Sequence, residues 1–425
     1  MNTLNEIAAQ LQGYNPNALR ADAAAQFLTH LVQPMTETRS VHLMDALGCV
    51  VAEDVISPVH VPAHDNSAMD GYAFAGAQLT THTPLELKVV GTALAGKAWV
   101  GTVGDLQCVK IMTGAVMPAG LDTVVPQEMV KREGETVTIA PDTVRFGDNR
   151  RCKGEDIRLG EPALRAGARI TPAALGLLAS LGVPQVTVLR RLRVAYFSTG
   201  DEILSLGEPP REGAVYDSNR YTIYGLLTRL GVDVIDMGVV RDDPAALEAA
   251  FRSAASQADA IITSGGVSVG EADHTKATMR KLADGDAGVV FWKIAMRPGR
   301  PMAVGHIGKT LLFGLPGNPV AVMVTFLAFV RPALLQMMGC TPRATPLLRA
   351  RSRVSIRKKP GRTEYQRAIV TAAPDGSLFA QLTGQQGSGV LSSMVQANGL
   401  LVLPHDQGNI AEGDEVSVLM FEGAI

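Results

Sequence analysis

The chain has 425 residues, which is too long for one hydrophobic core and predicts about three or four domains. Its 46% hydrophobic and 19% charged residues are ordinary for a soluble globular protein, and a net charge of −2 argues against a nucleic-acid binder held by bulk electrostatics. The 4 cysteines form no CxxC pair, so we expect no zinc site, no disulfide framework and a reducing, cytoplasmic compartment. No secretory leader is expected, and the longest apolar run, 320–330, is too short to span a bilayer and predicts a buried helix.

The first part of the chain predicts one domain interrupted by another. Helical patterns occur at three places: residues 17–31, 41–47 and 172–181. Residues 55–73 are rich in proline and predict an irregular loop, and short β-like pieces between 85 and 139 predict a small β module. An insertion explains this order: a first domain begins at the N-terminus, is interrupted by the β module, and resumes near Gly154.

From residue 192 onward, strand-like and helical patterns alternate. The strands are expected at 194–199, 232–238, 259–265 and 310–315, and the helices at 218–230, 244–258, 273–282 and 319–338. This alternation predicts βαβ units and a parallel, doubly wound α/β sheet. Regular short strands then predict a small terminal β domain, with strands at 353–358, 364–372, 377–383, 399–404 and 414–421.

The segment 258–277, ADAIITSGGVSVGEADHTKA, carries the strongest single signal for a site. A short apolar run suits a buried strand, and Gly265 and Gly266 then let the backbone turn sharply and approach a ligand. A helix follows with Asp273 as its expected N-cap, so free N–H groups and a positive helix end would suit an anion. Glu271 and Asp273 would suit a hard metal ion, although a tight turn that binds nothing would look similar.

Ligands of doubly wound sheets bind outside the carboxyl ends of the strands. Four turns fall at those ends: Ser198–Glu202, Asp242–Asp243, Ser264–Gly266 and Pro316–Pro319. In the last of them Asn318 is the expected helix cap and Pro319 the first helical residue. Four turns that converge on one edge predict a ligand site more strongly than any one of them.

The segment 291–304, FWKIAMRPGRPMAV, lies between the third and fourth expected strands. Its cations Lys293, Arg297 and Arg300 indicate anion capture beside the acidic turns, although a solvated loop is the simpler alternative. No phosphate-binding P-loop or dinucleotide fingerprint occurs, so a P-loop nucleotidase or nicotinamide enzyme is not favoured. No Ser/His/Asp or Cys/His constellation is visible either.

Seven motifs together resemble one family. They are DNSAMDGYA (65–73), IMTGA (111–115), GED (154–156), STGDE (198–202), SGGVSVGEAD (264–273), RPGRP (297–301) and GLPGNP (314–319). The set is similar to the molybdopterin molybdenumtransferase (MoeA) family, whose animal counterpart is the E domain of gephyrin. The resemblance covers nearly the whole chain, and DNSAMDGY together with GLPGNP is specific to this family. In RPGRP, arginines stand where the family often has lysine, and a planar guanidinium is not equivalent to a point charge.

The resemblance implies both fold and activity. It implies a multi-domain α/β protein with a segmented N-terminal domain I (1–52 and 154–188), an inserted β-rich domain II (53–153), an α/β molybdopterin-binding domain III (189–342) and a C-terminal β-barrel domain IV (343–425). It also implies an elongated homodimer that converts adenylylated molybdopterin and molybdate into molybdenum cofactor and AMP, with a divalent cation such as Mg²⁺. The adenylyltransferase of the same pathway is an expected partner.

The expected site residues fall into three sets. Catalytic roles are expected for Asp65, Thr113, Glu202, Asp242 and Asp273, and metal binding for Asp201, Glu202, Asp242 and Asp273. Substrate binding is expected for Ser264, Gly265, Gly266, Ser268, Lys293, Arg297, Arg300, Pro316, Gly317, Asn318 and Pro319. The resemblance further implies that Asp65 completes the cleft of the other protomer.

Two alternatives remain open. A molybdopterin adenylyltransferase shares the α/β module, but the length of the chain and DNSAMDGY argue against it. A gephyrin-like scaffold usually adds a linker and a second module, and this chain shows neither.

Overall fold

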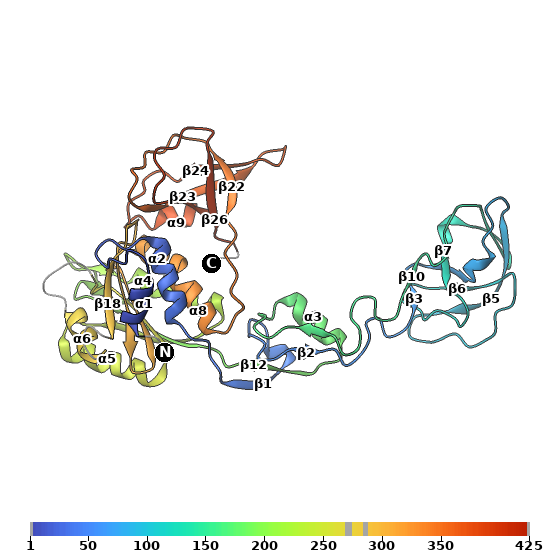
Figure 1. Cartoon of the computed structure of the whole chain (residues 1–425), viewed down its shortest axis with the longest axis horizontal. Helices are drawn as coiled ribbons and strands as arrows, with labels where there is room; N and C mark the ends of the chain where they lie inside the picture. The colour runs from blue at the N-terminus through green and yellow to red at the C-terminus, as the bar shows by residue number, and fades with distance from the viewer. Residues whose placement is uncertain (1–2, 268–273, 284–287, 423–425) are drawn as a thin grey trace.

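The computed structural model describes residues 3–267, 274–283 and 288–422. The molecule is elongated: the α/β domain and the C-terminal β domain lie together at one end, and the inserted β domain lies at the other (Figure 1). A small middle part built around β1, β12 and α3 connects the two ends (Figure 1). The expected multi-domain α/β architecture is therefore confirmed.

The middle part is held together by strands from distant parts of the sequence. β1 (Thr38–His42) pairs antiparallel with β12 (Gln185–Leu189), and α3 (Pro172–Ser180) packs beside them. The helix expected at 41–47 is wrong, because this segment is the end of β1 followed by the 3₁₀ turn Leu43–Asp45. Its pairing with β12 satisfies the backbone groups that a helix would have satisfied locally. Two short antiparallel pairs lead outward: β2 (Val55–Ile56) with β11 (Pro162–Leu164), and β3 (Asn66–Ser67) with β10 (Arg150–Arg151).

The inserted domain is a six-stranded sheet in the order β7-β4-β6-β5-β9-β8. Its strands are β4 (Gly71–Phe74), β5 (Leu85–Ala93), β6 (Gln107–Ile111), β7 (Thr123–Pro126), β8 (Lys131–Glu133) and β9 (Thr136–Ile139). Buried side chains form one apolar cluster around Tyr72 and another around Ala73, because successive strand residues point to opposite faces. The loop expected at 55–73 thus ends in the buried strand β4.

The α/β sheet has the order β16-β13-β17-β21-β20-β18. Four strands run parallel, as expected: β13 (Arg193–Thr199), β16 (Asp233–Val240), β17 (Ala260–Ser264) and β21 (Thr310–Leu315). Two antiparallel strands, β18 (Val289–Lys293) and β20 (Pro301–Ile307), extend the sheet beyond β21. They come from the segment that was expected to be a basic loop, so the loop itself is confined to the residues between them.

Helices cover both faces of this sheet. The elements are α1 (Leu4–Gln10), α2 (Ala21–Leu31), α4 (Ser218–Leu230), α5 (Pro244–Gln257), α6 (His274–Leu282), α7 (Pro319–Thr325) and α8 (Arg331–Met337), with the π-helical turn Phe326–Val330 between the last two. Side chains of α1, α2, α4, α7 and α8 bury one face, and those of α5 and α6 bury the other. The two N-terminal helices thus pack on the α/β core, although the expected boundary assigns them to the first domain.

One helix among the described residues, Pro319–Met337, is long and apolar enough to cross a membrane. Its 19 residues include a window with a mean hydropathy of 1.8, of which 67% is buried inside the protein. The packing of α7 and α8 against the sheet accounts for this apolar composition, because a helix that is hydrophobic all round is typical of a protein core.

The C-terminal domain is a closed five-stranded barrel in the order β23-β24-β22-β26-β25, closed by pairing of β23 with β25. Its elements are β22 (Leu348–Ser352), β23 (Thr363–Ala372), β24 (Leu378–Leu382), α9 (Ser392–Gln396), β25 (Gly399–Leu403) and β26 (Glu415–Met420). The strand expected at 353–358 is wrong; the first barrel strand ends at Ser352. β19 (Met296–Arg297), within the basic loop of the α/β domain, pairs with β23 and joins the two domains.

Phe27 of α2 offers a test of the packing between the N-terminal helices and the α/β domain. Its fully buried ring meets Trp292 edge to face with centroids 5.1 Å apart and stacks on Tyr14 at 5.8 Å. We expect Phe27→Ala to lower the free energy of unfolding of this domain by about 3–5 kcal/mol, measured by denaturant titration. The exposed Phe146 is the matched control, and an equal loss in Phe146→Ala would contradict the assignment of α2 to this core.

Candidate functional site

The parallel strands create a crevice where their order reverses. β13 pairs with β16 on one side and with β17 on the other, so the connections after β13 and β17 leave the sheet in opposite directions. Beyond β13 a short parallel pair forms, β14 (Ile203–Leu204) with β15 (Val215–Tyr216), and leads into α4. This switch point is where doubly wound sheets bind ligands.

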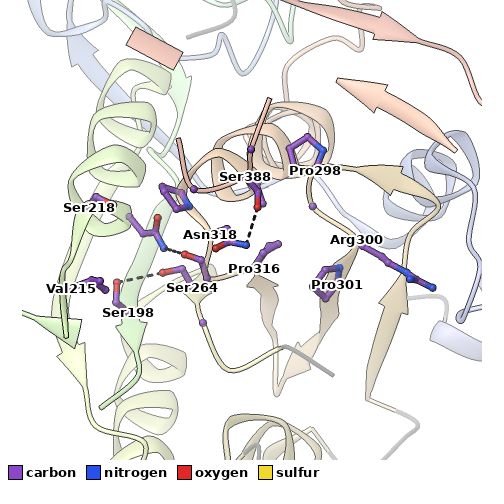
Figure 2. A pocket seen from close by; sticks show the side chains of 18 of the residues that line it. Ser198, Val215, Ser218, Ser264, Pro298, Arg300, Pro301, Pro316, Asn318 and Ser388 are labelled. Atoms are coloured by element: carbon purple, nitrogen blue, oxygen red, sulfur yellow. Dashed lines mark hydrogen bonds between the residues drawn. The ribbon is translucent and has the colours of Figure 1, made fainter. Parts of the chain in front are cut away.

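A cleft of about 1000 Å³ opens at this edge. It is lined by the strand ends Ser198–Thr199 and Ser264–Gly266, by the start of α4, by the basic loop Met296–Pro301, by Pro316–Pro319 and by Gln386–Gly389 of the barrel. Figure 2 shows Ser198, Val215 and Ser218 on one side of the cleft, Asn318 and Ser388 near its middle, and Arg300 on the opposite side. Three of the four expected turns therefore converge.

The double glycine after β17 is required by its surroundings. Gly265 and Gly266 have φ angles of +89° and +63°, which lie in the left-handed region. A Cβ on Gly265 would collide with the carbonyl oxygen of Thr199, and one on Gly266 with the side chain of Thr275. Only glycine lets the backbone here lie against β13 and the start of α6 while facing the cleft.

A buried hydroxyl cluster lies at the strand ends below this turn, where Ser198 and Ser264 line the cleft and Tyr196 does not. The Tyr196 hydroxyl lies 2.9 Å from Ser198 Oγ and 2.6 Å from Ser264 Oγ. Burial raises the pKa of Tyr196 well above its ordinary value of 10.0, so the phenol stays protonated. This cluster can donate and accept hydrogen bonds without adding charge.

The turn Pro316–Pro319 of the α/β domain is hydrogen-bonded to the barrel across the cleft. Asn318 lies at the N-cap position of α7 and Pro319 begins the helix, as expected, but the Asn318 side chain makes no capping hydrogen bond. Its Nδ2 instead donates to Ser388 Oγ of the barrel, 3.0 Å away (Figure 2). The backbone N–H of Val320 also donates to the Ser388 carbonyl oxygen, at 3.1 Å.

A buried arginine fixes the barrel loop that carries Ser388. Arg367 is 1% exposed and donates to the carbonyl oxygens of Gln385 and Gly387 at 3.2 and 2.9 Å, and to Ser393 Oγ at 2.9 Å. A guanidinium can satisfy several carbonyls at once because its donors form a rigid planar fork. The loop is therefore held in place before any ligand arrives.

Three arginines line the cleft: Arg297, Arg300 and Arg362. Arg362 comes from the barrel, where its Nε donates to Glu364 Oε1 at 2.8 Å and leaves further donors toward the cleft. The expected cation Lys293 is not among the lining residues; it ends β18, where its backbone pairs with Pro16 and Leu19. The basic wall thus combines two expected arginines with one from another domain.

The expected acidic residues are only partly brought together. Glu202 lines the cleft, whereas Asp201 and Asp242 lie beside it, with the Asp242 N–H donating to Asp201 Oδ1 at 3.3 Å. Desolvation raises the pKa of Asp242 above 3.8, and the nearby Asp201 and Glu202 charges raise it further against the effect of His274. Its Oδ1 is buried without a hydrogen-bond partner among the described residues. Asp273 and Ser268 lie outside the described residues.

The other two expected catalytic residues lie far from this cleft within the chain. Asp65 accepts from the Lys153 N–H at 2.8 Å and lies 3.8 Å from Arg150, at the base of the inserted domain. Thr113 donates through both its N–H and its Oγ1 to Asp70 Oδ1, each at 2.7 Å. They adjoin β3 and β6, which lie at the far end of the elongated molecule (Figure 1).

Several lining residues were not expected from the sequence. Asn219 was taken only as part of the helix expected at 218–230, Asp217 just before it was given no role, and Arg362 and Ser388 were taken only as part of a β domain. The polar run Asp217–Ser218–Asn219 before an apolar helix was the one available signal for the first pair. No local signal could find the barrel residues, because their place depends on how two domains pack.

A doubly wound sheet with an arginine-lined cleft at its switch point defines an α/β protein whose cleft is suited to anionic ligands. Family models match almost all of the chain: the MoeA N-terminal region (domain I and II) at residues 19–182, a probable molybdopterin binding domain at 195–336, and the MoeA C-terminal region (domain IV) at 349–421. The chain belongs to the molybdopterin molybdenumtransferase (MoeA) family, and it is a transferase.

Individual relatives agree with this assignment. A molybdopterin molybdenumtransferase of Haemophilus influenzae is 41% identical over 94% of this chain and 97% of its own length, and one of Bacillus subtilis is 34% identical over 94% and 93%. The crystal structure of a molybdopterin biosynthesis MoeA protein from Pyrococcus horikoshii is 28% identical and superposes with a TM-score of 0.79, covering 95% of this chain and 100% of that one.

Asp242 gives a pH-dependent test of the acidic cluster. The pKa of this acid is raised in the folded state, so its ionised form costs stability above that pKa, and the cost disappears below the unfolded value near 3.8. We expect Asp242→Asn to raise the thermal midpoint at pH 7 by on the order of 2 °C, with a gain that shrinks as the pH falls toward 4. The exposed Asp233→Asn is the control. A lower midpoint for Asp242→Asn at pH 7 would show that the ionised Asp242 carboxylate does not destabilise the fold.

Proposed function

We propose that this chain inserts molybdate into adenylylated molybdopterin and releases AMP and molybdenum cofactor. The observation that carries the proposal is the cleft itself, in which backbone turns, a helix start and three arginines meet at the switch point of the sheet. A phosphate-bearing substrate and a tetrahedral oxyanion both need N–H groups and cations, and this cleft supplies them. The named activity of the relatives supports the same reaction.

The chain's own residues would bind and orient rather than form a covalent bond. The substrate's dithiolene sulfurs capture the molybdenum, so no protein nucleophile is needed. Ser198 and Ser264, which line the cleft, would offer neutral hydrogen bonds to the bound substrate, and the Tyr196 hydroxyl would hold their side chains in place. Arg297, Arg300 and Arg362 would hold the oxyanion.

We propose Mg²⁺ as the divalent cation, held beside the acidic turns. The buried, unpaired Asp242 Oδ1 and the neighbouring Asp201 and Glu202 carboxylates suit a hard cation. In the part of the chain that the structure describes, no group of three His, Cys, Asp or Glu side chains is arranged for a metal. Mg²⁺ is usually held by one or two carboxylates together with substrate phosphates and water, so a complete set of protein ligands is not required for the proposal. When bound, it would neutralise charge on the departing AMP.

A direct assay tests the proposed function. Purified full-length protein, adenylylated molybdopterin, molybdate and Mg²⁺ are mixed, and AMP release is followed by chromatography. AMP should appear only with molybdate and a divalent cation, and excess EDTA should abolish it. The adenylyltransferase alternative would consume ATP and molybdopterin instead, and a scaffold would release nothing. Release of AMP without molybdate would contradict the proposal.

The basic wall gives a prediction about molybdate. We expect Arg297→Ala and Arg362→Ala to raise the molybdate concentration for half-maximal AMP release about tenfold or more, because each removes a charge-assisted contact to the oxyanion. The dependence on adenylylated molybdopterin should change less, because backbone groups at the turns can hold its phosphates. The exposed Lys309→Ala serves as the control. An unchanged molybdate dependence in both arginine variants would exclude this role.

We further propose that the protein works as a homodimer in which the Asp65 loop completes the partner's cleft. The strands next to Asp65 and Thr113, β3 and β6, are separated from the α/β domain of their own chain by the middle part of the molecule (Figure 1). A two-fold pair of such elongated chains would place each far end at the other's cleft. The 4 cysteines, all free, fit a cytoplasmic setting in which the adenylyltransferase of the pathway can hand over its product.

Subunit exchange tests the shared cleft. Asp65→Ala and Glu202→Ala homodimers should each be nearly inactive. After exchange, half of the dimers carry one cleft with both changes and one with neither, so about a quarter of wild-type AMP release should return. Labelled subunits confirm that exchange has occurred, and a mixture of two Glu202→Ala preparations is the control. No recovery after proven exchange would show that each cleft lies within one chain.

A further inference from the structure

Two buried oxygens at the start of α4 have no hydrogen-bond partner among the residues described. They are Asp217 Oδ2 and Asn219 Oδ1. The two side chains belong to residues only 4% and 8% exposed, and both residues line the cleft. Leaving a buried acceptor unpaired costs free energy, so a pair of them at a ligand cleft calls for a matching pair of donors.

The other polar atoms of these side chains fix what the free oxygens can do. Asp217 Oδ1 accepts from the Arg220 N–H at 3.0 Å and so caps α4. Asn219 Nδ2 donates to the Gly317 carbonyl oxygen at 2.7 Å, which settles the orientation of the amide because a carbonyl cannot donate. Both side chains are therefore locked, and each keeps one buried oxygen that can only accept.

We propose that Asp217 and Asn219 recognise the aminopyrimidinone edge of the pterin ring of the substrate; this inference rests on the proposed function. That edge carries two adjacent donors, the 2-amino group and the ring N3–H, which match two acceptors. Adenine does not match them, because its 6-amino donor stands beside the N1 acceptor. The acceptor pair thus selects the pterin over the adenylate of the same substrate.

The rest of the cleft supports this orientation. Figure 2 places Ser218, which lies between the two acceptor residues in the chain, on the side of the cleft opposite Arg300. Arg297 and Arg362 also line the cleft, and Arg300 lies across it from the start of α4. A substrate with a donor edge at its ring and anionic groups at its tail fits in one direction only, and the reverse placement would set donors against arginines.

A conservative variant isolates the free oxygen. Asp217→Asn keeps an oxygen to cap α4, since asparagine caps as well as aspartate, and puts an NH₂ donor where Oδ2 accepts. The probes are pterin and lumazine, whose ring has a carbonyl in place of the 2-amino group; binding to the full-length protein is followed through their own fluorescence. Wild type should bind pterin about tenfold or more tightly than lumazine, and Asp217→Asn should lose or reverse this preference.

Two further variants protect the conclusion. Asp414→Asn removes a carboxylate that accepts from the Ala411 N–H at 2.8 Å in the barrel, outside the cleft, and should keep the wild-type preference. The serine of Asp217→Ser also caps α4 but has no second oxygen. This variant should abolish the preference for pterin over lumazine without reversing it. It replaces Asp217→Asn if that variant is unstable.

The outcomes separate the inference from the proposed function. Absence of AMP release by wild type in the direct assay would remove the function, whatever the pterin data show. If wild type releases AMP but binds pterin and lumazine equally, or if Asp217→Asn and Asp217→Ser keep the wild-type preference, the acceptor pair is overturned and the function stands. A tenfold fall in pterin preference in both variants, with Asp414→Asn unchanged, supports the inference.

Discussion

The reversal of strand order beside β13 is the constraint on which the site depends. Because β16 and β17 lie on opposite sides of β13, the chain segments that follow β13 and β17 diverge and leave a crevice between them. The double glycine makes this crevice usable: without side chains at Gly265 and Gly266, the backbone after β17 can lie against Thr199 and Thr275. The start of α4 and the turn before α7 then close two further sides.

The crevice becomes a deep cleft only because the barrel covers it. β19 pairs with β23, so the arginine loop of the α/β domain is also an edge strand of the barrel sheet. The Asn318–Ser388 hydrogen bond ties the turn before α7 to the barrel, and Arg367 fixes the loop that carries Ser388. The position of the cationic wall is therefore set by contacts between two domains, and a change in the barrel can alter anion binding without touching the sheet.

Sequence patterns predicted the parts whose cause is local. α4, Ser218–Leu230, coincides with its predicted range because Asp217 caps its start and Gly231 adopts a left-handed conformation at its end. The parallel strands were predicted from short apolar runs between turns, as expected for strands buried on both faces. β18 and β20 were missed because proline and glycine in the intervening RPGRP marked the segment as loop, and β1 was missed because its partner β12 lies far along the chain.

The site residues that could be predicted are likewise those whose positions have a local cause in the sequence. Residues at the carboxyl ends of strands follow from the sheet, so Ser264, Gly265 and Pro316 were found. Lys293 was placed in the wall only because it is near Arg297 in sequence; as the last residue of β18 it belongs to a neighbouring strand. The positions of Arg362 and Ser388 depend on how the barrel packs against the α/β domain. No residue spacing in the sequence indicates this packing.

The elongated shape separates the polar groups of the chain into two distant sets. A single chain offers acceptors, hydroxyls and arginines in its cleft, while Asp65 and Thr113 stand at its far end, each held by local hydrogen bonds. Short antiparallel pairs on the way to the inserted domain, β2 with β11 and β3 with β10, run the outgoing and returning strands together as one arm. These pairs belong to the arm that holds Asp65 and Thr113 at the inserted domain and not at the cleft. Under the proposed function, a second chain would therefore have to supply these two residues to the cleft.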